Sequence, residues 1–131
     1  MAKILLIEDD AAVRAVLCDT LLRFGHGVTQ ARNGKEGLAL LAVAAPDLVI
    51  TDIIMPEQEG LAVLLEVKTK WPAVKLIAMS GGGRQNPAEY LRLATFFGAA
   101  RTLMKPFSNL VLSEAISAVL ASSATGQRSS R

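Results

Sequence analysis

Short apolar runs alternate along the chain with longer segments in which apolar residues recur at helical spacing. A compact apolar run is typical of a strand covered on both faces, whereas spacing of three and four residues is typical of an amphipathic helix. The predicted strands span residues 3–7, 28–31, 47–51, 74–79 and 101–104. The predicted helices span residues 10–24, 34–44, 58–70, 87–97 and 109–121. This alternation predicts a parallel sheet with helices on both faces.

Residues that break or cap helices stand at the ends of these segments. Gly98 follows the fourth predicted helix, and Asn33 and Ser108 precede the second and the fifth at cap positions. Beyond Ala121 the chain is rich in Ser, Gly and Arg, a composition typical of disorder. We therefore predict one domain over residues 1–121 and a disordered polar tail over residues 122–131.

The charge of the chain argues against a surface that binds nucleic acid through overall charge. The net charge is +2, from 14 basic and 12 acidic residues, and both excess charges, Arg128 and Arg131, lie in the predicted tail. The predicted domain is therefore neutral, whereas proteins that bind nucleic acid by bulk electrostatics are strongly basic. We expect no direct contact with nucleic acid.

Cysteine content and hydropathy indicate a soluble cytoplasmic protein. Cys18 is the single cysteine, so an internal disulfide is impossible, which fits a reducing compartment. The longest apolar stretch, residues 38–45, is far too short to span a bilayer, and the N-terminus does not resemble a signal peptide. We therefore expect no contact with a membrane.

Polar residues follow the apolar runs at the ends of four predicted strands. Glu8 and Asp9 follow the first strand, Asp52 the third, Ser80 the fourth and Lys105 the fifth. Because the carboxyl ends of parallel strands meet at one edge of a sheet, these side chains are expected to converge there. Any one of them alone could be an ordinary loop residue, but their joint occurrence favours a functional site.

Three clustered carboxylates repel one another unless a cation joins them. Oxygen ligands select a hard cation, and few protein ligands with room for water favour Mg²⁺ over a closed Ca²⁺ site. A bound Mg²⁺ beside a lysine suits phosphoryl transfer, and a carboxylate in such a site can itself be the nucleophile. The strand ends therefore predict a magnesium-dependent site at which one of the carboxylates takes up a phosphoryl group.

The chain resembles the response-regulator receiver domains of bacterial two-component signalling over roughly residues 2–121. The resemblance rests on four segments: 4–10 (ILLIEDD), 33–38 (NGKEGL), 47–56 (DLVITDIIMP) and 105–107 (KPF). It implies a flavodoxin-like doubly wound fold, with a five-stranded parallel sheet in the order 2-1-3-4-5 and five helices.

The resemblance also implies a role for each residue of the predicted site. Asp52 is the phosphoacceptor, and the metal site consists of Glu8, Asp9, Asp52 and Ile54, the last through its backbone carbonyl. Asp9 binds Mg²⁺ directly and Glu8 binds it through water.

Two further residues complete the site that the resemblance implies. The Ser80 hydroxyl and the Lys105 ammonium each bind a phosphoryl oxygen, and Ser80 occupies the switch position. The chain catalyses only its own phosphorylation and dephosphorylation, so it is not expected to be an enzyme that acts on a separate substrate.

The implied partners follow from this signalling role. A sensor histidine kinase or a phosphotransfer protein donates the phosphoryl group, a small acyl phosphate can replace it, and a downstream protein reads the phosphorylated state. A homodimer is compatible with the resemblance. The sequence names neither the kinase nor the downstream protein.

The chain departs from the family pattern at two places. Thr102 stands where receivers usually carry the aromatic residue that swings inward after phosphorylation, three positions before Lys105. Gly81, Gly82 and Gly83 follow Ser80, where alanine is common directly after the switch hydroxyl. These glycines could donate N–H groups to a phosphate or form a mobile loop, and the loop is the preferred interpretation. The departures concern the output of the signal rather than the uptake of phosphate.

Two other functions remain open at this point. A protein-binding module that works without phosphorylation is compatible with Thr102, although the complete acidic site argues against it. A phosphatase of the haloacid dehalogenase type would need an Asp-x-Asp motif after the first strand, and Glu8-Asp9-Asp10 lacks that spacing.

Overall fold

The computed structural model describes residues 1–53, 59–81 and 87–129, of which residues 59–60, 87–91 and 122–129 are described in their backbone elements only. The strands are β1 (Lys3–Ile7), β2 (Gly27–Ala31), β3 (Leu48–Asp52), β4 (Lys75–Ser80) and β5 (Arg101–Met104). The helices are α1 (Ala11–Arg23), α2 (Gly34–Val43), α3 (Glu59–Lys70), α4 (Pro87–Phe96) and α5 (Asn109–Ser129). The predicted alternation of strands and helices is confirmed.

The five strands form one parallel sheet in the order β2-β1-β3-β4-β5. This is the flavodoxin-like order that the resemblance implied, so the fold prediction is confirmed. The connections run outward in opposite directions from β1 and β3, and ligands of open α/β sheets bind beyond the strand ends at such a reversal. The carboxyl ends of β1 and β3 therefore mark where a site is expected.

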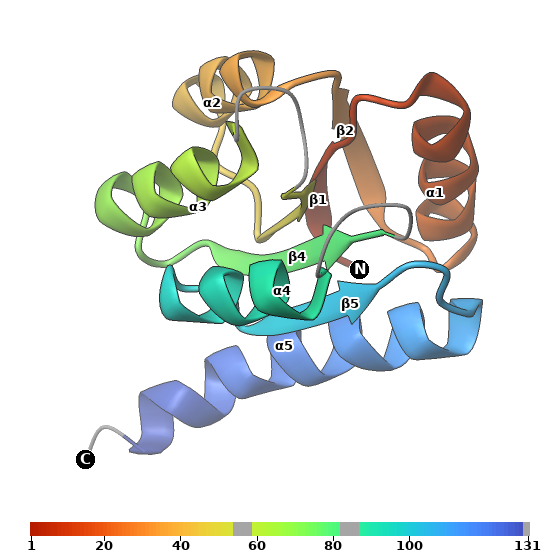
Figure 1. The fold of residues 1–131 in the computed structure, drawn as a ribbon. Coiled ribbons are helices and arrows are strands. Elements are labelled where there is room, and N and C mark those ends of the chain that lie inside the picture. The colour runs from red at the N-terminus through yellow and green to blue at the C-terminus, as the bar shows by residue number, and fades with distance from the viewer. Residues whose placement is uncertain (54–58, 82–86, 130–131) are drawn as a thin grey trace.

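Each face of the sheet is covered by its own set of helices (Figure 1). α2, α3 and α4 cover one face, where the buried cluster includes Leu41, Val63, Leu64, Val67 and Ala94. α1 and α5 cover the other, where it includes Cys18, Leu21, Leu112, Ile116 and Val119. Because β1, β3 and β4 are buried on both faces, their side chains are almost all apolar, as strands of a covered parallel sheet must be.

The last helix is longer than the sequence predicted. α5 continues to Ser129, whereas we expected a helical end near Ala121. Alanine and serine in the segment after Ala121 are compatible with helix, and no proline interrupts it. The division into a domain of residues 1–121 and a disordered tail remains a prediction. Within the described ranges, no helix combines the length and the hydropathy that a membrane span requires.

Gly37 allows α2 to lie unusually close to β1. A Cβ atom at this position would stand 2.5 Å from Ile7 Cδ1 and 2.9 Å from Ile7 Cγ1. The start of α2 is fixed nearby, since Asn33 Oδ1 accepts from the backbone N–H of Glu36 at 2.7 Å and Glu36 Oε1 accepts from that of Arg32 at 2.6 Å. The reciprocal cap explains Asn33 and Glu36, and the close contact with Ile7 explains Gly37, so these three residues of the 33–38 segment have structural roles.

We expect Gly37→Ala to destabilise the fold by about 1–3 kcal/mol, the usual cost of overpacking a filled core, because Ile7 is fully buried and has little room to move. The gain in helix propensity, about 1 kcal/mol, offsets only part of this cost. Urea unfolding measures the difference. Gly27→Ala is the matched control, since a Cβ atom there meets nothing within 4 Å. Equal stability of the two variants would contradict the close contact.

Candidate functional site

Four strands bring polar side chains to the carboxyl edge of the sheet. Asp52 is the last residue of β3 and Ser80 the last of β4, while Glu8 and Lys105 directly follow β1 and β5. Glu8, Asp52 and Ser80 are buried, with exposed fractions of 1%, 5% and 0%. Buried carboxylates are rare unless they are paired or bind a cation, so this edge is chemically distinct from the rest of the sheet.

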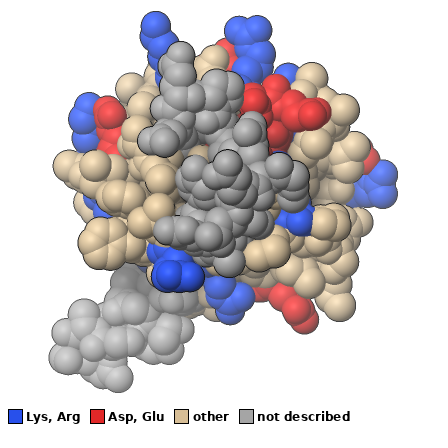
Figure 2. Space-filling view, in the orientation of Figure 1, with Lys and Arg blue, Asp and Glu red and all other residues tan. Residues whose placement is uncertain are grey.

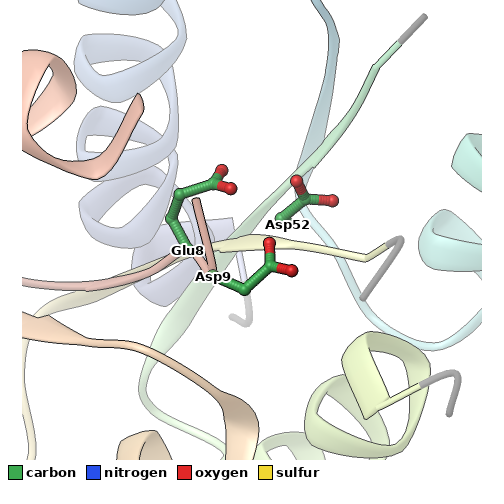
Figure 3. A group of neighbouring side chains, drawn as sticks. All are labelled: Glu8, Asp9 and Asp52. Atoms are coloured by element: carbon green, nitrogen blue, oxygen red, sulfur yellow. The ribbon is translucent and has the colours of Figure 1, made fainter. Parts of the chain in front are cut away.

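The carboxylates form a compact cluster. One oxygen from each of Glu8, Asp9 and Asp52 lies within 4.8 Å of the others. Figure 3 shows the three side chains, two from the turn after β1 and one from the end of β3, projecting into the same space beyond the strands. The donor set consists of oxygen atoms alone, and Asp9 is exposed, which leaves room for water. These residues therefore fit Mg²⁺, which combines one or two carboxylates with several waters.

Lys105 lies between the two buried carboxylates. Its Nζ atom is 2.7 Å from Asp52 Oδ2 and 2.9 Å from Glu8 Oε1. Burial raises the pKa of Glu8 above its ordinary value, and the nearby Asp52 charge raises it further, while the contact with Lys105 opposes this. Burial alone would lower the pKa of Lys105, but the hydrogen bonds to Asp52 and Glu8 hold it above its ordinary value. Lys105 thus lies among the carboxylates at the strand ends, where it was expected; its contact with a phosphoryl oxygen stays a prediction.

The path of Lys105 depends on the end of β4. The backbone N–H of Lys105 donates to the Ser80 carbonyl at 2.7 Å, and the following Lys105–Pro106 peptide bond is cis. A Cβ atom at Gly81 would stand 2.9 Å from Lys105 Cδ and 3.3 Å from its Cβ. The glycine that departs from the family pattern therefore makes room for the aliphatic part of Lys105. Neither alternative for Gly82 and Gly83 is tested, since both residues lie outside the described ranges.

The Ser80 hydroxyl is a buried polar group that lacks a partner among the described residues. Its Oγ atom makes no hydrogen bond to any of them, and Ser80 is fully buried. Buried hydroxyls in native proteins almost always have a partner, so an orphaned one needs an explanation. Ser80 stands at the same edge as Asp52, on the adjacent strand. An oxygen-rich group held at Asp52 would supply a hydrogen-bond acceptor on that side of the site.

The turn between β1 and α1 is fixed by a residue that sequence reasoning missed. Arg14 Nη1 donates to the Glu8 carbonyl oxygen at 2.7 Å. Asp10 caps α1, since its Oδ1 accepts from the backbone N–H groups of Ala12 and Val13 at 2.9 and 3.0 Å. No sequence pattern indicated this contact of Arg14, because an arginine in the second turn of a helix is ordinarily a solvated residue.

Two other predictions concern Ile54 and Thr102. Ile54, whose carbonyl was expected to bind the metal, lies outside the described residues. Thr102 is half-buried on β5, in register with Ala78 of β4, so a small side chain occupies the position of the usual aromatic residue.

Acidic and basic side chains are interspersed on the face of the molecule seen in Figure 2. The described residues on this face form no broad basic area, which agrees with the neutral charge of the predicted domain. Proteins that bind nucleic acid by bulk electrostatics present such an area. The view therefore gives no support for a nucleic-acid surface on this side.

Comparison with known proteins finds relatives that match most of the chain. A model of the response regulator receiver domain matches residues 4–117. Response regulator protein FleR of Pseudomonas aeruginosa is 39% identical over 107 residues, which cover 81% of this chain and 22% of FleR. Chemotaxis protein CheY of Thermotoga maritima is 35% identical over 121 residues, which cover 91% of this chain and 98% of CheY. The chain thus spans less than a quarter of FleR but almost all of this CheY.

Solved structures agree with the sequence comparison. The crystal structure of a response regulator receiver domain protein from Clostridium thermocellum superposes on this chain with a TM-score of 0.86 at 31% identity. The superposition covers 95% of this chain and 98% of that one. The similarity therefore extends over the whole architecture and is not confined to the acidic edge.

Proposed function

The chain belongs to the family of response regulator receiver domains, and on this premise we propose that Asp52 accepts a phosphoryl group from a phosphohistidine or a small acyl phosphate. The observation that carries the proposal is the contact of 2.7 Å between Lys105 Nζ and Asp52 Oδ2, beside the cluster with Glu8 and Asp9. A nucleophilic carboxylate, a fixed ammonium and a set of metal ligands are what phosphoryl transfer requires.

The transfer itself needs few protein groups. An Asp52 carboxylate oxygen attacks phosphorus, a bond from this oxygen to phosphorus forms, and the bond from phosphorus to the donor breaks. The leaving group departs as acetate from acetyl phosphate or as imidazole from a phosphohistidine, which takes up a proton. Lys105 stabilises the charge on the equatorial oxygens, because its ammonium already lies within hydrogen-bond distance of Asp52.

The metal would be held by the carboxylates of Glu8, Asp9 and Asp52, with the Ile54 carbonyl as the further ligand that the family implies. Asp9 is the exposed member of the set and suits a direct contact, whereas Glu8 is engaged with Lys105 and suits a contact through water. When bound, Mg²⁺ supplies positive charge to the phosphoryl oxygens.

Ser80 is the residue that would report phosphorylation. Its buried hydroxyl has no acceptor within the described ranges, and a phosphoryl group on Asp52 would supply one on the adjacent strand. The new hydrogen bond favours a packing in which the segment after β4 lies nearer the phosphoryl group, which is a shift between two populations. A sensor histidine kinase or phosphotransfer protein is the proposed donor, and a downstream protein reads the shift in the cytoplasm.

Labelling from acetyl phosphate tests the function without the unidentified kinase. We expect the chain to incorporate phosphate when Mg²⁺ is present and none when a chelator removes the metal. The linkage should be stable in acid and cleaved by base and by hydroxylamine, since these reagents attack an acyl phosphate. Intact-protein mass spectrometry follows each step. The absence of labelling would favour the module that binds partners without phosphorylation, and a linkage resistant to hydroxylamine would exclude an aspartyl phosphate.

We expect Asp9→Asn to weaken Mg²⁺ binding at least about tenfold. Loss of a residue that only supports a metal ligand already weakens metal binding by about this factor, and Asp9 is proposed as a ligand itself. The variant loses a full charge at the exposed side of the cluster. Isothermal titration with MgCl₂ measures the affinity. Asp10→Asn is the matched control, because asparagine caps a helix as well as aspartate does and Asp10 already performs that role. Unchanged affinity in Asp9→Asn would remove Asp9 from the ligand set.

A further inference from the structure

The Asp9 carboxylate, on the exposed side of the cluster, is placed by its backbone alone. Within the described ranges no hydrogen bond holds this carboxylate, and Asp9 is exposed. Glu8 and Asp52, in contrast, are buried and share the Lys105 ammonium. The geometry of the three oxygen ligands therefore depends on how firmly the turn from β1 to α1 is held.

Besides the Asp10 cap of α1 and the contact with Lys105, three hydrogen bonds of Glu8 hold that turn in the described part of the chain. The Glu8 N–H donates to the Ala31 carbonyl at 3.1 Å and so extends the pairing of β1 with β2 by one residue. The Asp10 N–H donates to Glu8 Oε2 at 3.1 Å. Arg14 Nη1 donates to the Glu8 carbonyl at 2.7 Å, which is the shortest of the three. Of these bonds, the one from Arg14 is made by a side chain of α1 rather than by the strands or the turn itself.

The hydrogen bond from Arg14 constrains Asp9 through the peptide group that joins Glu8 to Asp9. A peptide group is planar, so the Glu8 carbonyl, the Asp9 N–H and the Cα atoms of both residues lie in one plane. Fixing the carbonyl oxygen fixes the tilt of this plane, and with it the direction in which the Asp9 side chain leaves the backbone. Arg14 is half-buried, so its guanidinium is partly withdrawn from water and its bond to the carbonyl is charge-assisted.

We infer that Arg14 is a positioning residue for the divalent cation: it holds the Glu8–Asp9 peptide so that the Asp9 carboxylate meets those of Glu8 and Asp52. The inference rests on the proposed function for the identity of the cation. It adds a residue of α1 that binds neither the metal nor the phosphoryl group. Outer partners that orient metal ligands commonly control affinity in this way.

Charge and position predict opposite effects for the loss of Arg14. A guanidinium that bonds the Glu8 carbonyl repels a divalent cation bound by the Glu8 and Asp9 side chains, so its removal would strengthen Mg²⁺ binding if charge were its only influence. Loss of the hydrogen bond frees the peptide and costs the site its preorganisation, so removal weakens binding if position dominates. The sign of the change therefore separates the two roles.

The experiment compares Mg²⁺ affinity in the unchanged chain, Arg14→Met and Arg14→Lys by isothermal titration with MgCl₂. We expect Arg14→Met to bind about tenfold more weakly, the low end of the range for outer partners of a metal. Arg14→Lys keeps the charge and one donor, so it should recover part of the affinity. Arg23→Met is the matched control, because Arg23 lies on the same helix and pairs with Asp19 at the exposed surface. It should bind Mg²⁺ as the unchanged chain does.

Each outcome has one meaning. Equal or tighter binding by Arg14→Met overturns the inference and leaves the proposed function intact. If the unchanged chain binds no Mg²⁺, the metal part of the proposed function fails and the inference fails with it. Urea unfolding shows which variants are folded at the temperature of the titration. Should Arg14→Met be unfolded, Arg14→Lys decides: binding weaker than that of the unchanged chain supports positioning, and equal or tighter binding contradicts it.

Discussion

Asp52→Asn protein is expected to incorporate no hydroxylamine-labile phosphate from acetyl phosphate and Mg²⁺ under conditions in which the unchanged chain does. Asparagine has nearly the shape of aspartate and therefore fits the buried end of β3. Its carboxamide has no anionic oxygen to attack phosphorus, and the acidic cluster loses one of its three charges. Intact-protein mass spectrometry before and after hydroxylamine measures the difference.

The same strand offers a control for this substitution. Asp47 directly precedes β3, so it lies at the opposite edge of the sheet, where it is exposed and accepts from the Lys3 N–H at 2.9 Å. Asp47→Asn makes the same chemical change and loses the same charge outside the site, and we expect it to be labelled as the unchanged chain is. Equal labelling of Asp52→Asn and Asp47→Asn would remove Asp52 from its proposed role.

The fold could be predicted from the sequence because the pattern of apolar residues and the packing of the covered sheet require the same strands and helices. Strand β1 occurs as predicted, since a run of apolar residues between polar ones can be satisfied only inside a covered sheet. The end of α4 is also marked locally: Gly98 has a φ of +112°, a conformation that favours glycine. The end of α5 could not be placed in this way, because no comparable residue follows Ala121 directly.

The site was predictable only in part, because the strand order shows which residues lie at one edge of the sheet but not in which direction their side chains extend. Topology brought Glu8, Asp52 and Lys105 to one edge, as expected. The bridge from Lys105 to Glu8 depends on a path past Gly81, which is a matter of a few tenths of an ångström. The contact of Arg14 with a backbone carbonyl has no sequence signature, since an arginine near the start of a helix ordinarily points to solvent.

The switch is the least determined part of the chain. Ser80 and Thr102 lie on neighbouring strands. Within the described residues the Ser80 hydroxyl has no hydrogen-bond partner, and Thr102 stands where receivers usually carry an aromatic residue. A ring that swings inward fills the space left when the switch segment moves, and threonine is too small to do so. The phosphorylated state of this chain must therefore fill that space with another side chain or leave the segment closer to its original packing.

Lys105→Met should destabilise the fold and make its stability depend on both pH and Mg²⁺. Removing one partner of a buried ion pair commonly costs about 3–5 kcal/mol. We expect about 1–3 kcal/mol here, because the Lys105 side chain is 22% exposed and Glu8 can take up a proton. Lys70→Met is the control: its pair with Glu66 is solvent-exposed and should contribute less than about 1 kcal/mol.

The pH dependence of Lys105→Met follows from Glu8. Burial already raises the pKa of Glu8, and the contact with Lys105 opposes this rise, so the variant should raise that pKa further. A carboxyl group whose pKa is raised by folding adds stability below its unfolded value, near 4.5, and this stability is lost as the pH rises through the folded pKa. The loss relative to the unchanged chain should therefore be small at acid pH and larger near neutrality.

Magnesium should reverse much of this loss. A divalent cation among Glu8, Asp9 and Asp52 replaces the positive charge that Lys105 supplied, and a ligand that binds only the folded state stabilises it by mass action. Urea unfolding near neutral pH, with and without MgCl₂, should show a larger gain for Lys105→Met than for the unchanged chain. Labelling from acetyl phosphate should nevertheless stay slow, since the metal cannot replace the ammonium that contacts Asp52. A stability loss no greater than that of Lys70→Met, or the same gain from Mg²⁺ in both proteins, would contradict a central electrostatic role for Lys105.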